Sequence, residues 1–470
     1  MLERLENPVF RQSSRQRMRG GKTYGCLIAY LLVLGLVVVI SYEQFVSARV
    51  FPTTTGLAQV LFDTLVTTQW FLVAIITPAL TATAITVERE QRTFDLLLLT
   101  PLSRFAIVWG KFLSAVAFVV VMVVCGTPLV ALLFWMGGID LWAALERYAL
   151  ILLSGVLLAS FGLTMSAICS TSTLSILLTY GAFVSNYFVI LLAGVAMLAA
   201  RAFGGGAGLS LTALLPSWSA WQVWAFGIGA TLLATWLQLQ IAANYLLPDP
   251  RQGAWKTRLL TGALFLLALT AAVSLGRGAA ASTANIRQYM VIVCTMFLVW
   301  TVPMLATGVP LQGRRWIEWL HPRSLQVGSV QSVPLFVALL LLMGIVADQF
   351  LPAPLRSSPL AWAYAAAYLW WVWALGYFYS FRIRNRWGAL FALIGTLYFF
   401  AQVFANLANA FDRRVWFYLA GVTAPVELFD QPSDFAVWVP VYLILGLLSV
   451  WSTNLLERRR ERRLQQGSTR

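Results

Sequence analysis

Charged side chains gather in one short stretch of an otherwise apolar chain, residues 88–95. Glu88, Arg92 and Asp95 are spaced at i, i+4 and i+7, so on a helix they would form one acid–base–acid stripe. A run of leucines at 96–99 adds a wide apolar face. This pattern favours a short amphipathic helix at a membrane surface between two apolar spans. The alternative is a charged loop that leads into a capped helix.

The residues after this stretch predict where one helix stops and the next begins. Pro101 lacks a backbone N–H and restricts the residue before it, so the first helix should end near Thr100. Ser103 is placed to cap the next helix, because its hydroxyl can accept a bond from a free backbone N–H. We therefore place the amphipathic helix within 88–103.

The same stretch resembles the segment between the second and third spans in permeases of the type-2, exporter-class ATP-binding cassette transporters. The shared pattern is Glu-Arg-Glu, a threonine, an acid, leucines, Thr-Pro-Leu-Ser and a later Gly-Lys pair. Its members in this chain are Glu88, Arg89, Glu90, Thr93, Asp95, Thr100, Pro101, Leu102, Ser103, Gly110 and Lys111. Arg92 departs from the pattern, because it stands where glycine is common in that family.

The resemblance implies that 88–103 is a coupling helix, which docks on a separate ATP-binding cassette ATPase subunit. The residues that it assigns to this docking are Glu88, Arg89, Glu90, Arg92, Thr93, Asp95, Thr100 and Pro101. It also implies a permease in the bacterial cytoplasmic (inner) membrane that moves a substrate out of the cytoplasm. ATP would bind to the partner subunit, and this chain would bind no cofactor.

Composition places the chain in a membrane. The sequence is 60% hydrophobic and 11% charged, whereas a soluble domain has roughly 25% charged residues. We interpret the net charge of +15 as arginines in cytoplasmic loops rather than as a nucleic-acid surface. The four cysteines lie far apart and the single histidine has no nearby partner, so neither a disulfide framework nor a metal site is expected.

Apolar segments near the ~20 residues that cross a bilayer predict an all-α protein with twelve transmembrane helices. The predicted spans are 24–41, 66–87, 105–136, 146–169, 173–200, 218–243, 259–276, 288–310, 333–351, 360–381, 387–405 and 435–456. If the N-terminus is inside, most of the 33 lysines and arginines fall in inner loops. This bias predicts that both termini are cytoplasmic.

The spans and loops predict four parts of the chain. Residues 1–23 are a cytoplasmic basic segment, which either lies on anionic lipid or serves as a solvated tail. Residues 24–250 form a six-span permease half that contains the coupling helix. Residues 251–456 form a second six-span half, and 457–470 form a basic cytoplasmic tail.

The second half contains a weaker copy of the charged segment. Leu320 to Ser324 aligns with Leu99 to Ser103, and one acid stands upstream. The residues of this candidate second coupling loop are Glu318, His321 and Pro322. If the halves are a diverged repeat, one chain is a pseudo-dimer; otherwise the family resemblance implies a homodimer. The alternative for this loop is an interfacial helix broken by proline.

A few polar residues lie inside the predicted spans. Thr77, Thr81, Thr179 and Asn186 are candidates for the wall of a transport path, although helix–helix contact is the more common role of such residues. The aromatic cluster at 362–373 is interpreted as interfacial and lipid-facing packing.

The sequence contains no recognisable catalytic set. It has no paired carboxylate with a histidine in an aqueous loop, no GxSxG and no complete phosphate-binding loop. Two other functions stay open, a secondary transporter and a membrane-embedded lipid-modifying enzyme. The scarcity of ionisable residues within the spans counts against the first, and the lack of an acid or histidine cluster counts against the second.

Overall fold

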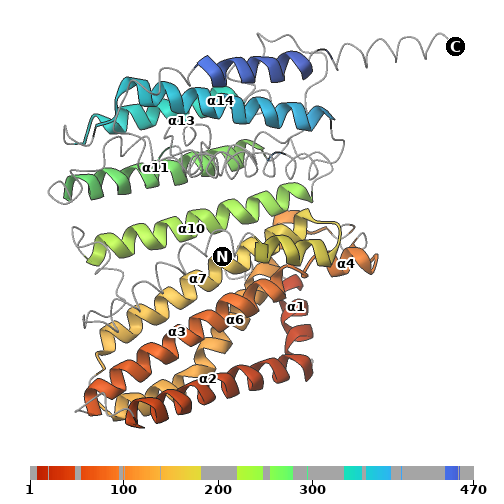
Figure 1. Cartoon of the computed structure of the whole chain (residues 1–470). Coiled ribbons are helices and arrows are strands. Elements are labelled where there is room, and N and C mark those ends of the chain that lie inside the picture. The colour runs from red at the N-terminus through yellow and green to blue at the C-terminus, as the bar shows by residue number, and fades with distance from the viewer. Residues whose placement is uncertain are drawn as a thin grey trace. The chain divides into compact units, whose positions relative to one another are not determined.

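The chain divides into two compact units, Met1–Pro250 and Arg251–Arg470, which are described separately. The structure is a computed structural model, shown in Figure 1. The residues that it describes are 8–19, 21–47, 54–94, 99, 101–137, 139–181, 220–246, 254–278, 294, 333–351, 356–382, 393, 440–453 and 455.

The described part of both units is helical and contains no strand, which confirms the all-α prediction. The helices of the first unit are α1 (Pro8–Arg19), α2 (Gly21–Ser47), α3 (Thr54–Thr81), α4 (Thr86–Glu90), α6 (Arg104–Trp135), α7 (Leu141–Ile168), helix 172–181 and α10 (Ala220–Tyr245). Those of the second unit are α11 (Ala254–Gly278), α13 (Val333–Asp348), α14 (Pro359–Arg382) and Pro440–Thr453.

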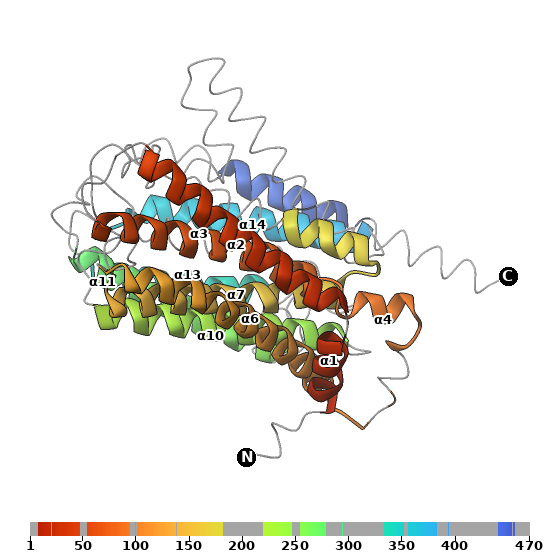
Figure 2. The ribbon, with the colours of Figure 1, turned by 90° about the horizontal axis from the view of Figure 1, so that it is seen from below.

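Three long helices, α3, α6 and α7, pack side by side in the first unit, and α7 also packs against α10 (Figures 1 and 2). Small residues permit the close approach of α7 to its neighbours. A Cβ atom at Gly162 would lie 2.1 Å from the Thr81 hydroxyl oxygen, and one at Gly155 would lie 2.8 Å from Val119. Close packing through small residues is the usual way in which helices associate in a membrane.

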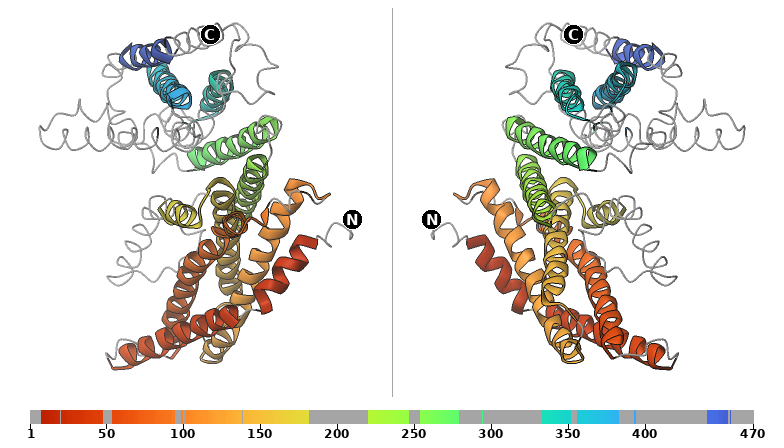
Figure 3. Two further views of the ribbon diagram at one scale, coloured as in Figure 1. Left: turned by 90° about the vertical axis from the view of Figure 1, so that its right-hand side faces the viewer. Right: turned by 90° about the vertical axis from the view of Figure 1, so that its left-hand side faces the viewer.

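The basic N-terminal segment forms α1, which begins at Pro8 because proline suits the first position of a helix. The helix packs against α6, and the side views in Figure 3 show the two together. Val9 is buried there, whereas Arg11 and Arg15 are exposed. Both α1 and α4 lie at the same end of the first unit, which we call the α4 end (Figures 1 and 2).

Six helices of the described part are long and apolar enough to cross a membrane. They are Tyr24–Phe45, Gly56–Glu90, Arg104–Trp135, Leu141–Ile168, Trp224–Tyr245 and Trp255–Ser274. The remaining predicted spans fall wholly or partly outside the described residues or are shorter or less apolar, so the twelve-span topology stays a prediction.

The second predicted span was too short at its start. The helix α3 begins at Thr54 rather than at residue 66, and it includes Asp63. This carboxylate forms an ion pair with Arg147 of α7, and the guanidinium also lies 5.1 Å from the centroid of the Phe62 ring. Because the two charges neutralise one another, a charged residue is accommodated inside a long apolar helix.

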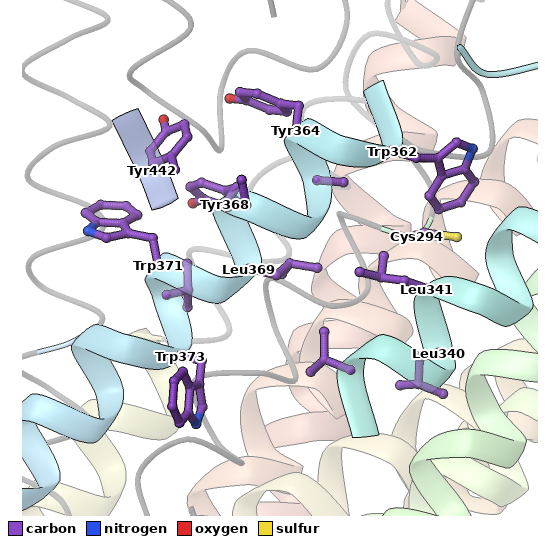
Figure 4. Close-up of a cluster of buried hydrophobic side chains, with 14 of the residues drawn as sticks. Cys294, Leu340, Leu341, Trp362, Tyr364, Tyr368, Leu369, Trp371, Trp373 and Tyr442 are labelled. Atoms are coloured by element: carbon purple, nitrogen blue, oxygen red, sulfur yellow. The ribbon is translucent and has the colours of Figure 1, made fainter. Parts of the chain in front are cut away.

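The second unit has an aromatic core, shown in Figure 4. Tyr364, Tyr368 and Trp371 of α14 surround Tyr442, with ring centroids 5.4–5.7 Å from it. Trp373 has only 1% of its surface exposed. The interpretation of residues 362–373 as lipid-facing is therefore wrong for these side chains, because α13 and Pro440–Thr453 supply packing partners that are distant in sequence.

Candidate functional site

The charged segment forms a short helix whose end is fixed by backbone geometry. The helix α4 stops at Glu90, and Arg92 has φ +56°, in the left-handed region. The Thr93 N–H donates to the Glu88 carbonyl at 3.0 Å, and the Arg92 N–H donates to the Arg89 carbonyl at 3.0 Å. These two bonds are those of a Schellman motif, in which the left-handed position is usually glycine. This geometry explains why glycine suits the position that Arg92 occupies.

The predicted stripe of Glu88, Arg92 and Asp95 on one continuous helix is therefore wrong. The left-handed residue turns the chain after Glu90, so Arg92 does not lie one helical turn above Glu88. Asp95 and Thr100 lie outside the described residues. The cap prediction is confirmed, because the Ser103 hydroxyl accepts a bond from the Ala106 N–H at 3.2 Å.

Glu88 pairs with a residue of the following long helix. The Lys111 ammonium of α6 lies 2.5 Å from the Glu88 carboxylate and donates also to the Ala84 carbonyl at 2.8 Å. The Lys111 side chain is 6% exposed and that of Glu88 is 32% exposed. This pair ties α4 to α6.

Arg89 binds the end of α7. Its two terminal nitrogens donate to the carbonyls of Ala167 and Cys169, each at 2.7 Å. The last carbonyls of a helix have no partner within the helix and carry partial negative charge. A guanidinium satisfies two of them at once and complements that charge.

Glu90 binds the start of the next helix. Its carboxylate accepts bonds from the Ser172 N–H at 2.7 Å and from the Ser172 hydroxyl at 2.9 Å. The same hydroxyl lies 3.0 Å from that of Thr86. Because a helix N-terminus carries partial positive charge, an acidic side chain is the suitable partner for helix 172–181.

A buried serine completes these contacts. The Ser166 hydroxyl of α7 accepts bonds from the Ile85 N–H at 2.8 Å and the Thr86 N–H at 3.1 Å. These N–H groups lie at the end of the turn at 82–85, which interrupts the helix between α3 and α4. We call the contacts of Arg89, Glu90, Thr86 and Ser166 with their partners the α4 clasp.

The described residues that follow the clasp are mostly exposed, although Phe94 is buried. Gln91, Arg92, Thr93, Leu99 and Pro101 are all exposed, and Leu99 has 81% of its surface accessible. The α4 end thus combines charges that are bonded within the protein with an exposed turn that has a basic side chain.

The candidate transport-path residues that the structure describes, Thr77, Thr81 and Thr179, are buried. Thr81 donates to the Thr77 carbonyl at 3.0 Å, and Thr179 donates to the Ser175 carbonyl at 2.6 Å. Thr77 is 1% exposed, and Asn186 lies outside the described residues. Glu318, His321 and Pro322 of the second loop also lie outside them. The roles predicted for these residues stay predictions.

Sequence reasoning did not find the partners of the charged segment. Lys111 was noticed only as part of a Gly-Lys pair, and Ser166 and Ser172 were not singled out. Ser166 and Ser172 lie about 80 residues from α4, so no local signal relates them to it. Among the described residues, no three His, Cys, Asp or Glu side chains gather as a metal ion would require.

The α4 clasp lies within a segment that matches a known family. Residues 8–302 match the family described as ABC-2 family transporter protein. The chain belongs to this family. It is therefore a multi-pass membrane protein and a membrane component of a transporter. The match covers the described helices of the first unit and ends within the second, and no curated protein matches the chain.

Proposed function

We propose that the chain is the membrane-spanning permease subunit of an ATP-driven export system in a bacterial cytoplasmic membrane. A separate ATPase subunit docks at the α4 end, on the exposed residues Gln91, Arg92, Thr93, Leu99 and Pro101. Both termini then lie in the cytoplasm, because α1 is at that same end and inner loops hold most of the basic residues.

One observation carries this proposal. The short α4 helix is bonded to α6, α7 and helix 172–181, while the turn after it is exposed. An exposed turn on a well-anchored segment can bind a partner without first being ordered, which lowers the entropic cost of association. A partner that pushes on this turn would act on three helices rather than on a loose loop.

The docking site has a defined chemistry. Arg92 is exposed at the tip, next to Gln91 and Thr93, and Leu99 adds apolar surface. The matching surface of the ATPase should therefore have an acidic side chain beside an apolar patch, because interfaces place opposite charges together around an apolar core.

Co-purification with the ATPase tests the proposal. The full chain, extracted in mild detergent from its own host, should bring down an ATP-binding subunit that hydrolyses ATP. Arg92→Glu should weaken that association at least about tenfold, because a like charge in an interface costs several kcal/mol. The matched control is Glu43→Lys, a charge reversal at an exposed position near the opposite end of α2.

Two outcomes would contradict the proposal. The first is a chain that purifies with no ATP-binding subunit and keeps its transport after ATP depletion, as a secondary transporter would. The second is an Arg92→Glu variant that holds its ATPase as tightly as the control does.

A further inference from the structure

We propose that Arg89 and Glu90 are positioning residues that make the turn at 169–171 move with α4. A displacement of α4 by the ATPase would then reach α7 and helix 172–181 directly, and not only the two spans that flank the docking segment. This inference rests on the proposed function for the source of the motion, and on the α4 clasp for its transmission.

Two interrupted helices face each other at the α4 end. The first interruption is the turn at 82–85 between α3 and α4, and the second is the turn at 169–171 between α7 and helix 172–181. Each interruption leaves backbone groups without partners in their own helix. In the clasp, each interrupted helix supplies partners to the other.

The bonds run in both directions. The hydroxyl of Ser166 in α7 accepts the N–H groups of Ile85 and Thr86. In return, Arg89 donates to two carbonyls at the end of α7, and Glu90 accepts from Ser172. If the turn at 82–85 moved relative to the turn at 169–171, several of these hydrogen-bonding groups would lose their partners at once. The two turns should therefore move as a single body.

The order of the two charges matches the two helix ends. Arg89 lies at the C-terminal end of α7, where a cation is favoured, and Glu90 lies at the N-terminal end of helix 172–181, where an anion is favoured. Exchanging the charges would place each against the wrong helix end. Arg89 followed by Glu90 therefore complements the charges of the two helix ends that the turn at 169–171 joins.

A disulfide across the clasp tests whether the two interruptions move together. Thr86→Cys with Ser172→Cys places two thiols where hydroxyl oxygens lie 3.0 Å apart. The four native cysteines are replaced in this background, and the chain is purified with its ATPase. After oxidation, ATP hydrolysis should stay within about twofold of the reduced sample. A loss of more than about tenfold that a reductant reverses would show that the clasp must open, and would overturn the inference.

A second measurement distinguishes a loss of coupled motion between α4 and helix 172–181 from a general folding defect. Spin labels at Val87 and Leu177, both exposed, report the distance between α4 and helix 172–181. This distance should be the same without nucleotide and with trapped ATP. In those complexes of Arg89→Ala/Glu90→Ala that contain the ATPase, it should become dependent on ATP. Thr83→Ala is the matched control, because its hydroxyl bonds only to the Ala79 carbonyl of its own segment.

The two proposals fail in different ways. If no ATPase co-purifies, the proposed function is wrong, and the inference that the clasp transmits motion from the ATPase is wrong as well. If the ATPase binds and hydrolyses ATP, but the label distance changes equally in the parent and in Arg89→Ala/Glu90→Ala, only the role of the clasp is wrong.

Discussion

At the scale of residues, each charge of the Glu-Arg-Glu run has a different partner. Glu88 binds an ammonium of α6, Arg89 binds carbonyls of α7, and Glu90 binds the start of helix 172–181. The prediction of one stripe through Glu88, Arg92 and Asp95 assumed that the helix continues past Glu90, and the left-handed conformation of Arg92 contradicts that assumption. Charge spacing alone gives a reliable partner only where the helix is continuous.

The Glu88–Lys111 pair predicts a charge-swap effect. Glu88→Lys should lower the midpoint of thermal unfolding in detergent, because it sets two ammonium groups together and removes a bond worth about 1.5–3 kcal/mol. Glu88→Lys/Lys111→Glu should recover part of the loss, with Glu43→Lys as the control. A double variant no more stable than Glu88→Lys would show that the pair contributes nothing to stability.

The backbone at Arg92 predicts opposite effects of two substitutions. A residue other than glycine in the left-handed conformation costs about 1 kcal/mol, so Arg92→Gly should relieve that cost and Arg92→Ala should not. Both remove the charge and should weaken ATPase binding, but Arg92→Gly should unfold at the higher temperature. Equal unfolding midpoints for the two variants would show that the left-handed backbone at residue 92 is not strained. Unchanged ATPase binding in both variants would show that the Arg92 charge has no role in docking.

At the scale of elements, two of the long helices contain an internal proline, Pro78 in α3 and Pro128 in α6. Each proline removes one backbone bond and leaves a carbonyl without its usual donor. Side chains bond to carbonyls near both sites. Tyr180 donates to the Ile75 carbonyl at 2.5 Å, and Gln69 donates to the Val123 carbonyl at 3.4 Å.

Gln69 also accepts a bond from the Tyr148 hydroxyl at 3.1 Å, so it links α3 to both α6 and α7. Gln69→Leu should therefore destabilise the protein by about 1–3 kcal/mol, as the loss of two interhelical bonds in a membrane implies. Thr68→Val is the control, because Thr68 donates to the Thr64 carbonyl in its own helix. Equal unfolding midpoints for the two variants would mean that the Gln69 bonds contribute no stability.

Helix positions followed from local sequence, and the contacts between helices did not. The predicted span 105–136 is α6 within one residue at each end, because Ser103 and the apolar run mark its start. The beginning of α3 was missed because Asp63 interrupts the apolar pattern, and its partner Arg147 lies in another helix. The clasp was missed for the same reason, since its bonds join segments about 80 residues apart.

At the scale of the whole molecule, the second half can be compared with the first for a second segment of the α4 type. When Leu320–Ser324 is aligned with Leu99–Ser103, positions 88–90 correspond to Val309, Pro310 and Leu311, which have no charge. The position of Lys111 corresponds to Ser332. In this alignment the second loop therefore has no charged residue at the positions of Glu88, Arg89, Glu90 and Lys111, whatever role Glu318 and His321 have.

This difference predicts the composition of the complex. An assembly with two equivalent ATPase contacts needs two segments of the α4 type, and the part of the chain that the structure describes contains one, so two copies of the chain are expected. The mass of the intact complex should fit two 52.1 kDa chains with two ATPase subunits. Arg92→Glu should release both ATPase subunits, while His321→Glu should release neither. A single chain that binds two ATPases, one of which is lost in His321→Glu, would instead establish the pseudo-dimer and make the second loop a docking site in its own right.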